Sequence, residues 1–84
     1  MKKTEDLITD KAIEIAFGNA NFGSNYTKRE IINNNLLKCA CGYALGRTAR
    51  YILEELGLVN SKLYTLTSIG NEYLWAAYSG GLSL

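Results

Sequence analysis

Two arginines, Arg47 and Arg50, occur in a segment whose apolar residues recur with the spacing of one helix face. This spacing predicts a helix over residues 43–56, with both arginines on its outward side. An arginine can donate two parallel hydrogen bonds to guanine, and a helix of about 20 Å, at about 1.5 Å per residue, suits the major groove of B-DNA. The segment therefore predicts a DNA-contacting helix. The residues expected to meet bases or nearby phosphates are Tyr43, Arg47, Thr48 and Arg50.

The same arginines also fit an ordinary solvated helix face. Arg50 precedes Glu54 by four residues, a spacing at which ion pairs form on helices, and Arg47 is spaced to stack on Tyr51. The residues alone leave both interpretations open.

Further cations lie in two other segments. Lys28 and Arg29 follow Thr27 in a Thr-Lys-Arg-Glu sequence that matches a capping box, so they occupy the first turn of a predicted helix. Cations there oppose the helix dipole; phosphate contact would give them a role, although exposed cations at a helix start also arise by chance. Lys62, at the tip of a predicted turn, and Lys38 are expected as further phosphate contacts.

Catalysis and cofactor binding find no support in the residues. The chain has no histidine, no Ser or Cys nucleophile with an evident base, and no glycine loop that would cradle a phosphate. Cys39 and Cys41 cannot complete a four-ligand zinc site within one chain, so we expect reduced, buried or half-buried thiols. A metal shared by the Cys-x-Cys pairs of a dimer is the alternative. We expect a protein that is not an enzyme and holds no metal or cofactor.

The elements that must position these residues are four helices and a hairpin. Helices are expected over Glu5–Phe17, from Thr27 to about Ala40, over 43–56, and from Thr67 to about Tyr78. Gly42 is expected to turn the chain sharply between the second and third helices. Leu58–Asn60 and Leu63–Leu66 bracket Ser61 and Lys62 and predict a short β-hairpin. The tail over 79–84 is expected to fray.

In this arrangement the chain resembles the winged helix-turn-helix superfamily, chiefly where the helix ending in Glu-Glu-Leu-Gly-Leu-Val runs into the predicted hairpin. The resemblance spans about Thr4 to Tyr78. It implies a mainly α fold with a small β-hairpin: a three-helix core, a short wing and a C-terminal helix, forming a single domain over residues 1–84. It also implies a transcriptional regulator that binds double-stranded DNA, with the helix at 43–56 in the major groove.

The last predicted helix carries more apolar surface than a monomer needs. Tyr73, Trp75 and Tyr78 are therefore candidates for a homodimer or partner interface, although Tyr73 also fits the core. The alternative function is a protein-interaction module, such as a small inhibitor of a partner protein of the kind that mobile elements encode. A short wing and a net charge of +1 favour that alternative.

Length and composition limit the classes that remain. A chain of 84 residues corresponds to one small domain. No apolar run approaches the roughly 20 residues needed to span a bilayer, and the first residues do not read as a signal peptide. We expect a soluble, cytoplasmic protein without a membrane partner.

Overall fold

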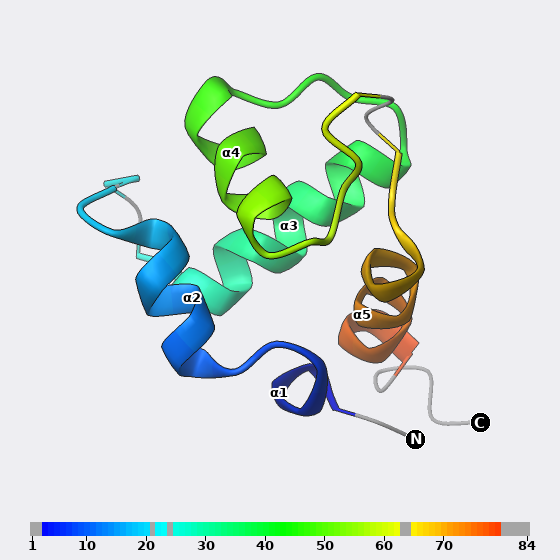
Figure 1. The fold of residues 1–84 in the computed structure, drawn as a ribbon, viewed down its shortest axis with the longest axis horizontal. Coiled ribbons are helices and arrows are strands. Elements are labelled where there is room, and N and C mark those ends of the chain that lie inside the picture. Colours follow the sequence, from blue (N-terminus) through cyan, green and yellow to red (C-terminus); the bar gives the residue numbers. More distant parts are fainter. Residues whose placement is uncertain (1–2, 21, 24, 63–64, 80–84) are drawn as a thin grey trace.

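The computed structural model describes residues 3–20, 22–23, 25–62 and 65–79, and it is built from helices around one core (Figure 1). The helices are α1 (Thr4–Leu7), α2 (Asp10–Phe17), α3 (Lys28–Ala40), α4 (Arg47–Glu55) and α5 (Ser68–Ser79). α3 packs against α2, α4 and α5, α2 also packs against α4, and α1 packs against α5. The central position of α3 means that α4 and α5 are held in place by the same helix.

A single helix over Glu5–Phe17 is wrong, because the chain bends between α1 and α2. Ile8 is extended, with φ −132° and ψ 115°. Thr9 then caps α2 by accepting a hydrogen bond from the Ala12 amide at 3.1 Å. The bend carries the Ile8 side chain into the core, where it is 8% exposed.

The second predicted helix is confirmed. α3 begins with the expected capping box, in which the Glu30 amide donates to the Thr27 hydroxyl at 3.1 Å and the Thr27 amide donates to Glu30 Oε1 at 2.9 Å. Gly42, with φ 86°, makes the expected turn after this helix.

The third helix begins later than predicted. Residues 43–46 form a loop, and α4 starts at Arg47 after Gly46, whose ψ of 157° is extended. Leu45, which the predicted helix over 43–56 would include, instead packs against the core from this loop. Ala49, Ile52 and Leu53 form the buried face of α4, as the spacing predicts.

The β-hairpin, and with it the winged helix, is wrong. The part of the chain that the structure describes contains no strand; Val59 and Leu66 form an isolated antiparallel bridge. The Asn60 amide donates to the Thr65 carbonyl at 2.7 Å beside this bridge. Leu63 and Tyr64, on which half of the predicted hairpin depends, lie outside the described residues.

The pairing lies between two helix ends that are tied together. Gly57, with φ 73°, lies two residues after the end of α4, and Thr67 caps α5 by accepting a hydrogen bond from the Gly70 amide at 3.0 Å. The Thr67 hydroxyl donates to the Gly57 carbonyl at 2.5 Å, and the Thr67 amide donates to the Leu58 carbonyl at 3.0 Å. These bonds fix where α5 begins relative to the end of α4.

The last predicted helix is confirmed as α5, which closes the core. Tyr73 on α5 is 0% exposed, as are Leu36 on α3 and Leu58 after α4. Gly70 lets α5 approach closely, because a Cβ atom at this position would collide with the Leu58 carbonyl oxygen. Among the described residues, no helix is long and apolar enough to cross a membrane.

Candidate functional site

Lys28 and Arg29, two of the cations expected on phosphate, are engaged by carboxylates of α2. Lys28 Nζ lies 2.7 Å from Glu14 Oε2 and 5.7 Å from the centre of the Phe17 ring. Arg29 Nη2 lies 2.7 Å from Asp10 Oδ1, and its side chain is only 16% exposed. The positive charge at the start of α3 is therefore used to hold α2 in place.

Arg29 is the centre of a network that joins three helices. Its Nη2 also donates to the Ile8 carbonyl at 2.8 Å, and its Nη1 lies 3.5 Å from the Tyr73 hydroxyl. That hydroxyl donates to Asn33 Oδ1 at 2.7 Å. Burial raises the pKa of Tyr73, while the positive charge of Arg29 beside it lowers the same pKa. The network fixes the bend before α2 against α3 and α5.

The outward face of α4 carries four exposed side chains. They are Arg47, Thr48, Tyr51 and Glu55. At about 100° per residue these positions cover a continuous strip that faces away from the buried stripe. Arg50 was expected on this outward side as well. The structure places Arg50 and its neighbour Glu54 at the flank of α4, where each is partly buried.

Arg50 adopts the ion pair that the sequence left open. Its Nε lies 3.2 Å from Glu54 Oε1. Its Nη2 also donates to the Ser61 carbonyl at 3.4 Å, which holds the turn at 60–62 beside α4. Asn60 stabilises that turn by accepting a hydrogen bond from the Lys62 amide at 2.8 Å. Arg50 therefore positions the turn that presents Lys62.

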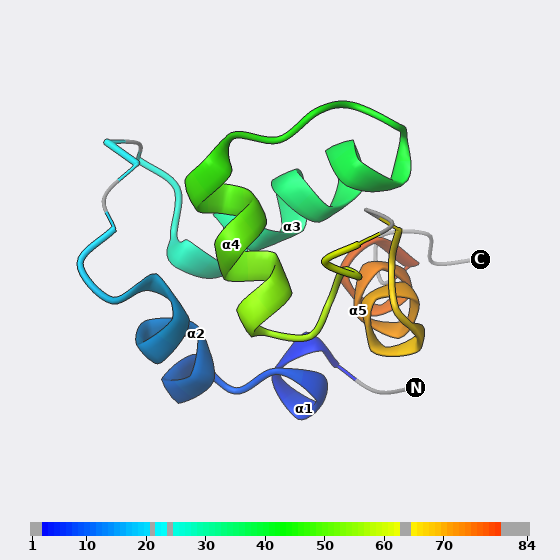
Figure 2. The same ribbon diagram turned by 45° about the horizontal axis from the view of Figure 1, so that its top comes forward.

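Acidic and basic residues are unevenly distributed along the chain, although its net charge is only +1. No Asp or Glu occurs over 31–53 or over 56–71, whereas these ranges contain Lys38, Arg47, Arg50 and Lys62. The end of α3, the loop at 43–46 and the start of α4 run along one edge of the molecule, and the turn at 60–62 lies next to α4 (Figures 1 and 2). We call Lys38, Arg47 and Lys62, with the loop at 43–46, the basic edge. The gaps between acidic residues are a sequence signal that could have located it.

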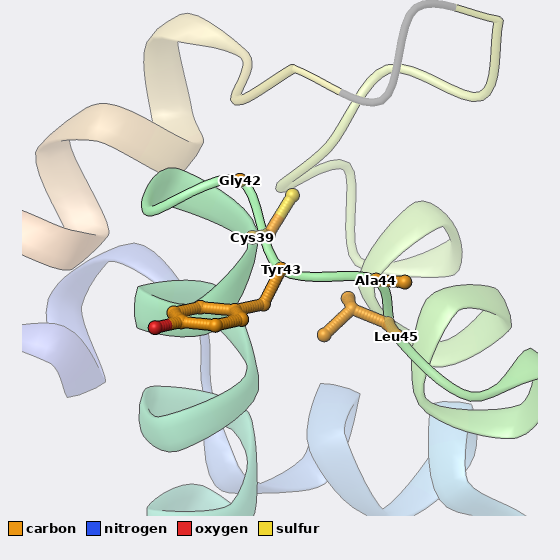
Figure 3. Close-up of a pocket in the computed structure, with 5 residues that line it drawn as sticks. All are labelled: Cys39, Gly42, Tyr43, Ala44 and Leu45. Atoms are coloured by element: carbon orange, nitrogen blue, oxygen red, sulfur yellow. The ribbon is translucent and has the colours of Figure 1, made fainter.

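Tyr43 lies on the basic edge and is 70% exposed. It stands in the loop before α4, and Figure 3 shows its ring beside α3. With Cys39, Gly42, Ala44 and Leu45 it lines an open hollow of about 390 Å³. An exposed aromatic ring among cations can stack on a sugar or a base.

The two cysteines are free thiols. Cys39 is partly buried and lines the hollow, and Cys41 is exposed. Burial raises the pKa of Cys39, which keeps this thiol protonated and a weak nucleophile. No cluster of three or more metal-binding side chains occurs among the residues that the structure describes.

The aromatic residues of α5 separate into two environments. Tyr73 is fully buried, whereas Trp75 is 64% exposed and Tyr78 is 38% exposed. Burial raises the pKa of Tyr78. Of the three residues expected at an interface, only Trp75 and Tyr78 are accessible to a partner.

Comparisons with protein families, curated proteins and solved structures found no match for this chain.

Proposed function

We propose that the protein binds double-stranded DNA through the basic edge, with α4 in the major groove. The observation that carries this proposal is the exposed Arg47 in the first turn of α4, within a range that has no carboxylate from residue 31 to residue 53. Arginine at the start of a groove-binding helix is placed to grip guanine through its O6 and N7 atoms. Thr48 follows Arg47 in α4, and Tyr43 lies at the other end of the loop at 43–46; both would make further base or phosphate contacts.

The helix has a suitable size for this role. With its nine residues, α4 is about 14 Å long at about 1.5 Å per residue, and it stands at the surface of the molecule (Figure 2). Lys38 near the end of α3 and Lys62 in the turn at 60–62 would contact phosphates of the DNA backbone. DNA binding by a chain of net charge +1 thus depends on where the cations lie, since Lys28 and Arg29 at the start of α3 are already paired.

The test is retention of a random-sequence duplex pool by the purified protein, at low and at near-physiological salt, followed by sequencing of the retained molecules. We expect an enriched motif, and binding that weakens steeply as salt rises. Absence of retention at low salt would overturn the proposal.

A protein-interaction module is the second candidate, and the exposure of Trp75 and Tyr78 on α5 favours it. Large exposed aromatics are common at the centres of protein interfaces. Replacing Trp75 with alanine would weaken such an interface and leave DNA binding unchanged. The regulatory role and the homodimer remain predictions; a sedimentation measurement at micromolar concentration tests the homodimer directly.

A further inference from the structure

The outward face of α4 changes its charge along its length. Arg47 and Thr48 are in the first turn, Tyr51 is one turn later, and Glu55 is at the last position of the helix. A hydrogen bond with Glu55 and the negative charge of that carboxylate raise the pKa of Tyr51. Tyr51 and Glu55 are four positions apart and both exposed, so they are neighbours on the same face of α4.

Glu55 differs from the other carboxylate at this end of α4. Glu54 is engaged by Arg50 at 3.2 Å, whereas no ion pair to Glu55 occurs within the described part of the chain. Because Glu55 is exposed, its carboxylate would face the groove together with Tyr51. A carboxylate there repels phosphates, so it costs affinity for DNA in general.

A hydrogen bond from one base, cytosine, would offset this loss of affinity. Cytosine is the base whose edge in the major groove presents only the N4 amino donor, and a carboxylate can accept a hydrogen bond from it. A carboxylate has two oxygens, so one can hold the Tyr51 hydroxyl while the other accepts from the base.

We propose that Glu55 is a specificity-determining residue that selects a cytosine, while Arg47 selects a guanine. The two residues are eight positions apart, which corresponds to about 12 Å along α4 at about 1.5 Å per residue. At about 3.4 Å per base pair, this distance equals three to four base-pair steps. The preferred site therefore contains two G·C pairs with that separation. This inference rests on the proposed function, because it assumes that α4 enters the major groove.

The test compares the wild-type protein with Glu55→Gln in the duplex selection described above. Glu72→Gln is the matched control, since Glu72 is an exposed carboxylate on α5 and its replacement removes the same charge. For Glu55→Gln we expect roughly tenfold weaker discrimination for cytosine at one position, a shift there toward adenine, and tighter binding to unrelated duplexes. For Glu72→Gln we expect the wild-type motif.

The outcomes separate the two proposals. If the wild-type protein retains no duplex, the proposed function fails and this inference fails with it. If the wild-type protein enriches a motif and Glu55→Gln enriches the same motif with the same discrimination, DNA binding stands and the role of Glu55 is overturned. Equal changes for Glu55→Gln and Glu72→Gln would also overturn it, because they would show an effect of net charge alone.

Discussion

Two helix ends, the starts of α3 and α4, place the same type of side chain in opposite surroundings. At the start of α3, Arg29 is 16% exposed and is held by Asp10 and the Ile8 carbonyl. At the start of α4, Arg47 is exposed in a stretch of chain without carboxylates. An arginine surrounded by acceptors stabilises the fold, whereas an arginine without them retains its hydrogen-bonding capacity for a ligand.

The difference lies in the neighbours that the fold brings together. Both arginines occupy the first helical turns, where a cation is unfavourable by itself. The bend before α2 places Asp10 against Arg29, and this contact crosses 19 positions of sequence. No acidic residue over 31–53 is available for the same purpose at Arg47. The first end is therefore structural, and the second is available for binding.

Replacing Arg29 with alanine should have the largest effect. The change removes hydrogen bonds to the exposed Asp10 carboxylate and to the partly buried Ile8 carbonyl, which is left without this donor, so we expect a loss of about 1–3 kcal/mol in the free energy of unfolding. Urea denaturation measures it. Arg47→Ala is the control, with an expected change within about 0.5 kcal/mol. Equal losses for the two variants would contradict the contrast between the two ends.

Replacing Arg47 with alanine should have the largest effect on binding. Loss of a bidentate contact to guanine should weaken binding to the selected duplex by about 10- to 100-fold and relax the sequence preference at one position. Fluorescence anisotropy at constant salt measures both effects. Lys11→Ala removes an exposed cation from α2 and should bind like the wild-type protein. A wild-type affinity for Arg47→Ala would exclude α4 as the reading helix.

Alanine variants of Lys62 and Lys28 should have smaller effects on duplex binding than Arg47→Ala. Lys62→Ala should weaken duplex binding a few-fold for all sequences and reduce the salt dependence by about one phosphate contact. Lys28→Ala should change neither, because Lys28 pairs with Glu14 at 2.7 Å. Titrations at several salt concentrations distinguish the two variants, and identical salt slopes would argue against the basic edge.

The smallest expected effect is the pH dependence of the stability that Tyr73 contributes beside Arg29. Burial raises the pKa of Tyr73 above its ordinary value of about 10, so the unfolded chain loses this proton first as pH rises. The contribution of Tyr73 to stability is fully present below pH 10 and is lost as pH rises through the folded-state pKa. Tyr73→Phe should be less stable than the wild-type protein at neutral pH, because Asn33 loses a hydrogen bond at 2.7 Å. Urea denaturation between pH 7 and pH 11 should show that this difference shrinks above pH 10.

Local signals in the sequence predicted several elements correctly. The capping box at Thr27 located the start of α3, Gly42 located the turn, and Thr67 located the start of α5. Each depends on hydrogen bonds or dihedral angles within a few residues, which local sequence specifies.

Other features depend on contacts that local patterns do not contain. The bend at Ile8 exists because the core accepts that side chain, and the predicted wing is reduced to the bridge between Val59 and Leu66. The pairing of Arg29 with Asp10 likewise depends on how α2 packs on α3. For the candidate site, the sequence predicted Arg47 and Thr48, which are exposed on α4, but it missed Tyr51 and Glu55; Arg50 is partly buried because Glu54 and the turn at 60–62 lie against it.

The most direct test of the central claim is the salt dependence of duplex binding by the wild-type protein and by the variant in which Lys38, Arg47 and Lys62 are all alanine. We expect the wild-type binding constant to fall with a logarithmic slope of about −2, as displacement of ions by the two phosphate contacts of Lys38 and Lys62 requires, and the variant to lose this binding. If the wild-type protein fails to bind duplex at low salt, or if the variant keeps the wild-type affinity and slope, then the basic edge is not a DNA-binding surface.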